Sequence, residues 1–447
     1  MARSFLDRLG EFGNQDAIVF GSEVVGYAQL LDRVADWDGY LGQHGVAQGT
    51  VVTIEGTYSP DMCAAMLALI ERGAIIVPLS SVPAAKREEF LDVAAVEVVV
   101  TLDERGGRHS QHTGRKAENA LYDQLRRASR PGLVLFSSGT TGRSKASVLD
   151  FTKVLGRYGD QSRPRRILAF LSLDHIGGIN TLLHTVNQGG TVVTSAERSP
   201  DRVFATIAEH KVQVLPTTPT FLNMTLISRA YERYSTETLE LVTYGTEPMP
   251  LHTLRRLNAV LPHVRFKQTY GLSELGIMPT QSKSNETLWL KLGNAGFEHK
   301  IVDGILWVRS EMAMLGYLNA PAPFDEAGFF NTQDMVESDG EYIRVLGRKS
   351  EIINVAGEKV YPSEVENVLL EIPNVAEACV VGQRNPVTGM VVKATLQLVK
   401  DEDEQTVRRR VYRHCRGRLE PFKVPMVIVL SRAAQHSERF KKVRSAS

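Results

Sequence analysis

A strand-like run that leads into a loop of glycines and hydroxyls constrains this chain most. Residues 132–136 (Gly-Leu-Val-Leu-Phe) are strand formers, and residues 137–145 (Ser-Ser-Gly-Thr-Thr-Gly-Arg-Ser-Lys) follow directly. The glycines allow sharp turns that bring backbone N–H groups close to a ligand, while the hydroxyls and Lys145 add donors and a positive charge. The Gly-Lys-Ser/Thr of a Walker A loop is missing. The pattern favours a phosphate-binding loop of another kind, with a plain surface turn as the alternative.

Length and composition indicate a globular chain of two or three domains. The chain has 447 residues, which exceeds one ordinary domain. Lys plus Arg (52) nearly balances Asp plus Glu (51), which argues against nucleic acid or an anionic membrane as a bulk partner. The three cysteines lack metal-ligand spacing, so we expect reduced thiols in a cytoplasmic protein. We also expect no signal peptide and no membrane span.

Alternating strand-like and helical runs predict α/β layers. Strand-like runs recur up to residue 266, with helical periods such as residues 64–70 between them, as is typical of buried, largely parallel sheets. The polar residues 103–118 are expected to form a loose loop. Two later runs lead to unusual segments at residues 174–178 and 270–274. Ligands of open α/β sheets collect beyond the carboxyl ends of strands, so a site is expected there.

The pattern changes after residue 290. Short β-rich runs at residues 304–308 and 341–346 predict a small antiparallel subdomain. Ser363 and Glu366 have the spacing of a capping box that opens an amphipathic helix, and an Arg-rich helix is expected over roughly residues 404–418. We therefore predict a large N-terminal domain of α/β layers with a β-rich subdomain (1–348) and a small α+β C-terminal domain (349–447).

Five segments in order resemble the motifs of the adenylate-forming superfamily, which includes acyl- and aryl-CoA synthetases, carrier-protein-loading adenylation domains and luciferases. The segments are residues 72–79 (Arg-Gly-Ala-Ile-Ile-Val-Pro-Leu), the loop 138–145, residues 268–274 (Gln-Thr-Tyr-Gly-Leu-Ser-Glu), residues 331–334 (Asn-Thr-Gln-Asp) and residues 347–362. The resemblance covers essentially the whole chain. It implies that ATP activates a carboxylic acid as an acyl-AMP with release of pyrophosphate, and that a thiol of CoA or of a carrier-protein pantetheine then takes the acyl group. It also implies that the C-terminal domain is a mobile lid.

The resemblance assigns the cofactor-binding residues. Tyr270 would stack on adenine, Asp334 would accept hydrogen bonds from the ribose, and Arg348 would reach the ribose or the α-phosphate. Glu274 would bind Mg²⁺, for which a solvated charge is the alternative. The full set is Ser138, Gly139, Thr140, Thr141, Gly142, Lys145, Gly245, Thr246, Glu247, Pro248, Tyr270, Gly271, Ser273, Asp334, Arg348 and Gly357. Gly357 would let a pantetheine arm pass, and the arginines of residues 408–418 would suit CoA phosphates or a carrier protein.

Three residues are assigned to catalysis by the same resemblance: Lys441, His175 and Glu274. His175 would line the acid pocket, with a structural histidine as the alternative and Asp174 as a minor candidate for binding an amine. Lys441 aligns with the family's Gly-Lys-x-x-Arg lysine if Phe440 replaces the glycine. Its ammonium would stabilise charge in the reaction. Lys442 competes for this role, and a solvated tail is the alternative.

Departures from the family motifs indicate a divergent branch. They are Ser144 and Ala146 around Lys145, Ile305 in place of the glutamate of the usual Gly-Glu-Leu, Gln333 in place of a glycine, Ser350 in the hinge, and Phe440. They put the thioester step in more doubt than adenylation, so transfer to an amine and a non-catalytic nucleotide or acyl sensor remain alternatives.

The acid pocket is expected from four segments. They are residues 175–180, 218–221, 244–246 and 271–277, and they contain no obvious cation for a second carboxylate. A neutral alkyl, aryl or alicyclic acid is therefore favoured over a diacid.

Overall fold

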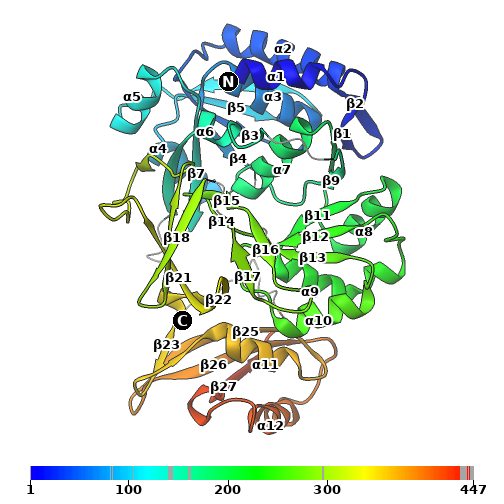
Figure 1. The fold of residues 1–447 in the computed structure, drawn as a ribbon, viewed down its shortest axis with the longest axis vertical. Helices are drawn as coiled ribbons and strands as arrows, with labels where there is room; N and C mark the ends of the chain where they lie inside the picture. Colours follow the sequence, from blue (N-terminus) through cyan, green and yellow to red (C-terminus); the bar gives the residue numbers. More distant parts are fainter. Residues whose placement is uncertain are drawn as a thin grey trace.

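Two seven-stranded sheets form the body of the N-terminal part of the molecule (Figure 1). The computed structural model describes residues 2–80, 82, 84–103, 105–138, 144–159, 163–293, 296–432, 440 and 442. The first sheet has the order β20-β8-β7-β4-β3-β5-β6 and the second has the order β13-β12-β11-β9-β10-β1-β2. Their inner strands pair in parallel, as the buried, β-branched sequence runs predict.

The strands of the first sheet are β3 (Val51–Glu55), β4 (Ile75–Leu79), β5 (Val98–Leu102), β6 (Arg108–His112), β7 (Gly132–Ser138), β8 (Ser144–Asp150) and β20 (Gly316–Tyr317). Those of the second are β1 (Asp16–Phe20), β2 (Glu23–Gly26), β9 (Arg166–Leu168), β10 (Thr191–Thr194), β11 (Val214–Thr217), β12 (Leu241–Tyr244) and β13 (Arg265–Gln268). The helices that cover them are α1 (Ala2–Gly10), α2 (Tyr27–Gln43), α3 (Pro60–Glu71), α4 (Ala84–Val93), α5 (Ala120–Arg127), α6 (Phe151–Leu155), α7 (Ile176–Asn187), α8 (Pro200–Glu209), α9 (Pro219–Ser228), the 3₁₀ turn η1 (Ala230–Glu232) and α10 (Leu251–Val260).

A third, antiparallel sheet of six strands follows, as predicted for the β-rich subdomain. It consists of β16 (Thr280–Ser282), β17 (Leu290–Leu292), β18 (Phe297–Val302), β19 (Ile305–Ser310), β21 (Phe330–Asp339) and β22 (Tyr342–Arg348). The hairpin of β14 (Tyr270–Leu272) and β15 (Gly276–Met278) connects it to β13. Part of its apolar face joins the large core around α3, whose residues are buried almost all round.

The C-terminal part has its own core and lies below the other sheets in Figure 1. Its elements are the 3₁₀ turn η2 (Lys349–Glu351), β23 (Ile353–Val355), β24 (Glu358–Val360), α11 (Pro362–Leu370), β25 (Val375–Asn385), β26 (Gly389–Leu398), α12 (Glu404–Cys415), the 3₁₀ turn η3 (Pro421–Lys423) and β27 (Val427–Leu430). This large α/β part with a small α+β part confirms the predicted fold class. Contacts between the two parts include two asparagine side chains: Asn223 Nδ2 donates to Ala376 O at 2.7 Å, and Asn367 Oδ1 accepts from Leu251 N at 3.2 Å.

Two local expectations are wrong. Residues 103–118 are not only a loop, because β6 pairs antiparallel with β5 at the sheet edge. Its polar side chains point largely to solvent, so no apolar pattern marks the strand. The capping box is also absent. Pro362 occupies the first helical position and Tyr361 is the N-cap, so Ser363 lies inside α11 and its Oγ donates to Leu346 O at 2.5 Å.

Cys63, Cys379 and Cys415 are buried free thiols. Among the residues that the structure describes, no helix has the length and apolar character needed to cross a bilayer.

Candidate functional site

Four segments meet around the carboxylate of Glu274. Glu274 is buried in the turn between β14 and β15, and its Oε1 accepts hydrogen bonds from the Tyr317 hydroxyl at 2.7 Å and from Ser137 Oγ at 3.3 Å. The Lys145 ammonium lies 5.3 Å from the centroid of the Tyr317 ring. The end of β7, the start of β8, β20 and the β14–β15 turn thus bring one carboxylate and one cation together beside the glycine loop.

Several residues predicted for the site lie outside the residues that the structure describes or away from the Glu274 cluster. Gly139, Thr140, Thr141, Gly142 and Lys441 lie outside the described residues, as does the side chain of Ser138. Ser273 is half-buried next to Glu274. Gly357 lies in the turn between β23 and β24 with φ +94°, and its N–H donates to Asn354 Oδ1 at 2.9 Å. Gly357 is therefore an exposed residue of the C-terminal part and does not belong to the Glu274 cluster.

Tyr270, Asp334 and Arg348 form a second cluster. The Tyr270 hydroxyl donates to Asp334 Oδ2 at 2.5 Å, and Arg348 Nε lies 3.6 Å from Asp334 Oδ1. The register of β21 and β22 places Asp334 opposite Arg348. Burial raises the pKa of the Asp334 carboxyl, an effect that the Arg348 guanidinium and the Tyr270 hydroxyl partly oppose. The ionised form of Asp334 therefore costs folding free energy, and buried groups with a shifted pKa are common at functional sites.

A cavity of about 550 Å³ lies between α7 and strands β11–β13. Predicted residues at its β12 and β14 end are Gly245, Thr246 and Gly271, and His175 lines it from α7. The 218–221 segment is not part of it, since Pro219 and Thr220 line a smaller cavity of about 20 Å³ elsewhere. Thr217 also lines the large cavity, and its buried Oγ1 has no hydrogen-bond partner among the described residues. An unpartnered buried hydroxyl at a cavity wall is typical of a ligand site.

The expectation that the pocket holds no cation is wrong. Five cations line the cavity: Arg157, Arg163, Arg165, Arg265 and Lys267. They lie outside the four segments from which the pocket was predicted. Arg163 and Arg165 precede β9, Arg265 and Lys267 lie on β13, and β11 and β12 join these two strands in one sheet. No local motif shows this arrangement.

His175 has a structural contact as well as a place at the cavity. It is the N-cap of α7, and its Nδ1 accepts a hydrogen bond from Gly177 N at 3.0 Å. Gly178 lets the first turn of α7 approach the backbone of residues 171–172, where a Cβ would lie 2.5 Å from Leu171 O. Asp174 is buried, accepts from Ser172 Oγ, and is not among the cavity-lining residues.

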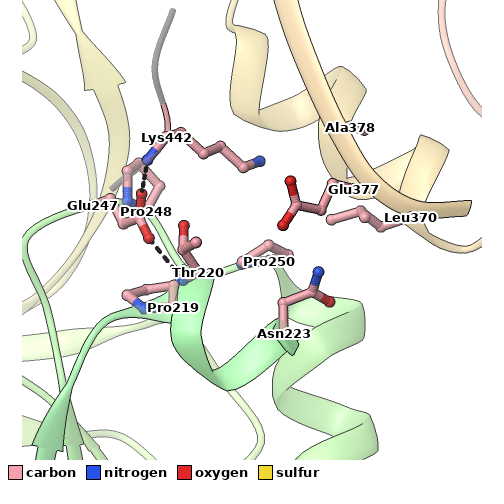
Figure 2. A pocket seen from close by; sticks show the side chains of 10 residues that line it. All are labelled: Pro219, Thr220, Asn223, Glu247, Pro248, Pro250, Leu370, Glu377, Ala378 and Lys442. Atoms are coloured by element: carbon pink, nitrogen blue, oxygen red, sulfur yellow. Dashed lines mark hydrogen bonds between the residues drawn. The ribbon is translucent and has the colours of Figure 1, made fainter. Parts of the chain in front are cut away.

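The end of the chain reaches back to the N-terminal part (Figure 2). Glu247 Oε1 accepts from Thr220 N at 2.7 Å, and Glu247 Oε2 accepts from Lys442 N at 3.0 Å. The Phe440 ring packs on Phe170 and Phe221 with centroids 5.1 and 5.7 Å away. Figure 2 shows the Lys442 side chain pointing away from Glu247, and its ammonium lies 2.8 Å from Glu366 Oε2. Glu247 and Pro248 therefore line the smaller cavity with Lys442.

Comparison with known proteins gives consistent matches over nearly the whole chain. A family model described as "AMP-binding enzyme" matches residues 5–318, and one described as "AMP-binding enzyme C-terminal domain" matches residues 364–441. The indoleacetate–CoA ligase of Aromatoleum aromaticum is 27% identical, with 92% of this chain and 90% of that protein covered. A fatty acid–[acyl-carrier-protein] ligase of Mycobacterium marinum is 25% identical, with 95% and 92% covered. The crystal structure of an anthranilate CoA ligase with anthranoyl-AMP matches with a TM-score of 0.82 at 18% identity, covering 99% of this chain and 97% of that one.

Proposed function

This chain belongs to the family of AMP-binding enzymes and is an acid–thiol ligase that activates a carboxylic acid with ATP, and we propose that its reaction takes place where the large cavity meets the Glu274 cluster. This proposal rests on one short segment that connects the large cavity to the Glu274 cluster. Gly271 lines the cavity, and Glu274 stands three residues later beside Ser137 and Lys145. An acid in the cavity and the phosphates of ATP at the glycine loop would therefore lie next to each other.

ATP would be held from three sides. The loop 138–145, with the Lys145 ammonium, would bind the β- and γ-phosphates. Asp334 would accept hydrogen bonds from the ribose hydroxyls, with Arg348 beside it, and Tyr270 would support the adenine from the same cluster. Gly245 and Thr246 would bring backbone close to the base. Because Asp334 already has a buried partner in Tyr270, its side chain is fixed in position before the nucleotide arrives.

The chemistry of Glu274 fits a Mg²⁺ ion. Hydrogen bonds from Tyr317 and Ser137 reach Oε1, which leaves Oε2 without a partner among the described residues. Within those residues, no group of three or more His, Cys, Asp or Glu side chains could hold a metal by itself. A single carboxylate oxygen suits Mg²⁺, which takes its other ligands from phosphates and water. When bound, Mg²⁺ would neutralise phosphate charge.

The first half-reaction joins acid and nucleotide. A carboxylate oxygen of the acid would attack the α-phosphorus of ATP, the bond to pyrophosphate would break, and acyl-AMP would form. Preorganised positive charge at that point stabilises the transition state. We assign this charge to Lys441, because the ammonium of its competitor Lys442 is engaged by the buried Glu366.

The second half-reaction passes the acyl group to a thiol. The sulfur of CoA or of a carrier-protein pantetheine would attack the acyl carbonyl carbon, and AMP would leave. Gly357 would reach the thiol channel after rotation of the C-terminal part about a hinge at Arg348. This rotation would break the hydrogen bonds that the Asn223 and Asn367 side chains make across the boundary.

Acid-dependent release of pyrophosphate from MgATP tests this function. A panel of aliphatic, aromatic and amino acids is assayed with and without CoA, and the thioester is identified by mass spectrometry. We expect release with one class of acid and a thioester when CoA is added. Turnover that requires an amine would replace the thiol as acceptor. Nucleotide binding without release for any acid would refute the ligase.

A further inference from the structure

One end of the large cavity, at the start of β13, gathers positive charge that no carboxylate neutralises within the described part of the chain: Arg265 is exposed there, and Arg157 and Lys267 are partly buried. Arg265 and Lys267 are two residues apart on β13 and both line the cavity, so they share one face of the strand. Arg157, from the segment after α6, lines it as well. No ion pair or side-chain hydrogen bond joins these three to a described residue. Arg163 and Arg165 differ, because each lies 3.7 Å from Glu240.

The unpaired cations also act on one another. Burial lowers the pKa of the Lys267 ammonium, and Arg265 and Arg157 lower it further. Burial lowers the pKa of His184 on α7, and Arg157 adds to that effect. These groups therefore lie within electrostatic reach of each other, and the empty cavity holds like charges that repel.

One contact offsets part of this repulsion, because the Arg157 guanidinium lies 5.7 Å from the centroid of the Phe297 ring. Cations that are partly removed from water, such as Arg157 and Lys267, are stabilised further by a carboxylate or another hydrogen-bond acceptor. Here no Asp or Glu is among the described residues that line the cavity. The unpartnered Oγ1 of Thr217 on β11 is a second group in the same wall that lacks its partner. Both observations indicate that a ligand completes the cavity, and the charge indicates that it is an anion.

We propose that the acid substrate carries a second anionic group, which Lys267, Arg157 and Arg265 hold at the end of the cavity where β13 starts. This inference rests on the proposed function and adds the class of substrate to it. Lys267 and Arg265 lie two and four residues before Thr269, which follows β13 at the end where the adenylate is expected. The rise per residue of a strand therefore places the second anion about 7 to 13 Å from the reacting carboxylate. Val214 and Leu241 line the cavity at the level of Arg265, and Leu171 lines it beyond the carboxyl end of β9. The substrate is an elongated dianion.

The test compares acids matched in length. Pyrophosphate release from MgATP is measured with α,ω-dicarboxylates from succinate to sebacate, with the monocarboxylates of the same lengths, and with acids that end in a sulfonate or phosphate. We expect the preferred acid to be a dianion, with kcat/KM at least about tenfold above its monocarboxylate partner, as one charged hydrogen bond supplies. The terminal group that gives the highest kcat/KM identifies whether the second anion is a carboxylate, a sulfonate or a phosphate.

Two substitutions assign the effect to the cations. Lys267→Met and Arg157→Met keep the apolar stem and remove the charge, so each should reduce the dianion-to-monoanion ratio about tenfold, and Lys267→Arg should restore most of it. Lys291→Met is the matched control, because Lys291 is a strand lysine on β17 whose ammonium pairs with Glu341 at the surface. It should leave the ratio unchanged.

A binding measurement separates this inference from the ligase function. In the absence of ATP, the preferred dicarboxylate should raise the Tm of the wild type more than that of Lys267→Met. Charge-dependent binding without pyrophosphate release would support the anion site and refute the ligase. Equal kcat/KM for mono- and dianions, unchanged by Lys267→Met and Arg157→Met, would overturn the anion site and leave the ligase standing.

Discussion

At the residue scale, Glu274 is the residue that we propose binds Mg²⁺ beside the phosphates of ATP. Its carboxylate is buried, and the Tyr317 and Ser137 hydroxyls orient it. Glu274→Gln keeps the size and one acceptor but removes the charge that Mg²⁺ requires. We expect kcat for pyrophosphate release to fall on the order of 100-fold, with little change in the free energy of unfolding. Tyr317→Phe is the control, since it removes one donor and keeps the charge. An equal loss in both variants would contradict the metal role.

Asp334 should show opposite effects on binding and stability. Because burial raises the pKa of its carboxyl, the ionised form costs folding free energy. Asp334→Asn removes that charge and keeps an acceptor for Tyr270. We expect the variant to be at least as stable as the wild type in urea unfolding, while its KM for ATP rises about tenfold with loss of a charged ribose contact. A variant with lower stability and unchanged KM would remove Asp334 from the nucleotide site.

The same raised pKa gives a pH dependence with a definite sign. The cost of ionised Asp334 is fully present above its raised folded-state pKa. It disappears below the ordinary value of 3.8, where the carboxyl is protonated in both the folded and unfolded states. The stability advantage of Asp334→Asn should therefore shrink as pH falls toward 4, measured by urea midpoints over a pH series. An advantage that stays constant with pH would show that the Asp334 carboxyl does not titrate in this way.

Two departures from the family motifs have a structural explanation at this scale. Gln333 and Phe440 both have positive φ, +62° and +52°, in the left-handed region that favours glycine. The backbone therefore keeps the glycine conformation although the residue has changed. Asn331 Oδ1 accepts from Gln333 N at 3.0 Å, and the Phe440 ring packs against Phe170. The motifs were visible in the sequence, but these compensating contacts were not, because they depend on tertiary neighbours.

At the element scale, the first turn of α7 fixes one wall of the cavity. A Cβ on Gly178 would lie well inside contact distance of Ser172 O and 2.5 Å from Leu171 O, both rigid backbone atoms. Gly178→Ala should therefore push the helix outward and destabilise the protein by about 2 kcal/mol or more, with a several-fold rise in KM for the acid. Chemical denaturation and steady-state kinetics measure both effects.

Gly39 in α2 provides the matched control for that substitution. A Cβ there meets no atom within 4 Å, so Gly39→Ala should stabilise the protein by about 1 kcal/mol through helix propensity alone. If Gly178→Ala also proves neutral or stabilising, the close approach of α7 to residues 171–172 is not what holds the cavity wall.

Elements with a strong apolar pattern were predictable, and those without one were not. The strands β7 (Gly132–Ser138) and β19 (Ile305–Ser310) fall within two residues of the runs expected at residues 132–136 and 304–308. The edge strand β6 was missed because its pairing with β5 satisfies the backbone while its polar side chains stay in water. The Arg-rich α12 begins at the expected Glu404 but ends at Cys415, where Gly417 with φ +80° follows.

At the scale of the whole molecule, the candidate site depends on strand register. The glycine loop, the Tyr270–Glu274 segment and Asp334 could be found from the sequence because each is a local motif. The cavity cations could not, since Arg157 and Lys267 are far apart in sequence and meet only through the packing of sheet and helix. Local motifs therefore predict the residues that bind ATP, whereas the charges that line the acid cavity depend on the tertiary structure.

The two parts of the molecule are held in this arrangement by a small number of polar contacts. Asn223 Nδ2 donates to Ala376 O, Asn367 Oδ1 accepts from Leu251 N, and Lys442 bridges Glu247 and Glu366. Phe440 lies at Thr218, whose Oγ1 donates to Phe440 O at 2.8 Å, next to the cavity-lining Thr217 at the carboxyl end of β11. Because Phe440 directly precedes Lys441 in the sequence, we expect this arrangement to favour adenylation.

Weakening the boundary should separate the two half-reactions. Asn223→Ala and Asn367→Ala each remove one hydrogen bond worth about 1 kcal/mol, which corresponds to about a fivefold shift in the domain equilibrium. Single-turnover kinetics should show acyl-AMP formation slowed several-fold, while thioester formation from preformed acyl-AMP stays equal or becomes faster. Asn14→Ala is the control, because Asn14 is exposed in the segment between α1 and β1. Figure 1 shows α1 at the opposite end of the molecule from the C-terminal part. Equal slowing of both steps would show that the boundary contacts stabilise the fold without selecting the adenylating arrangement.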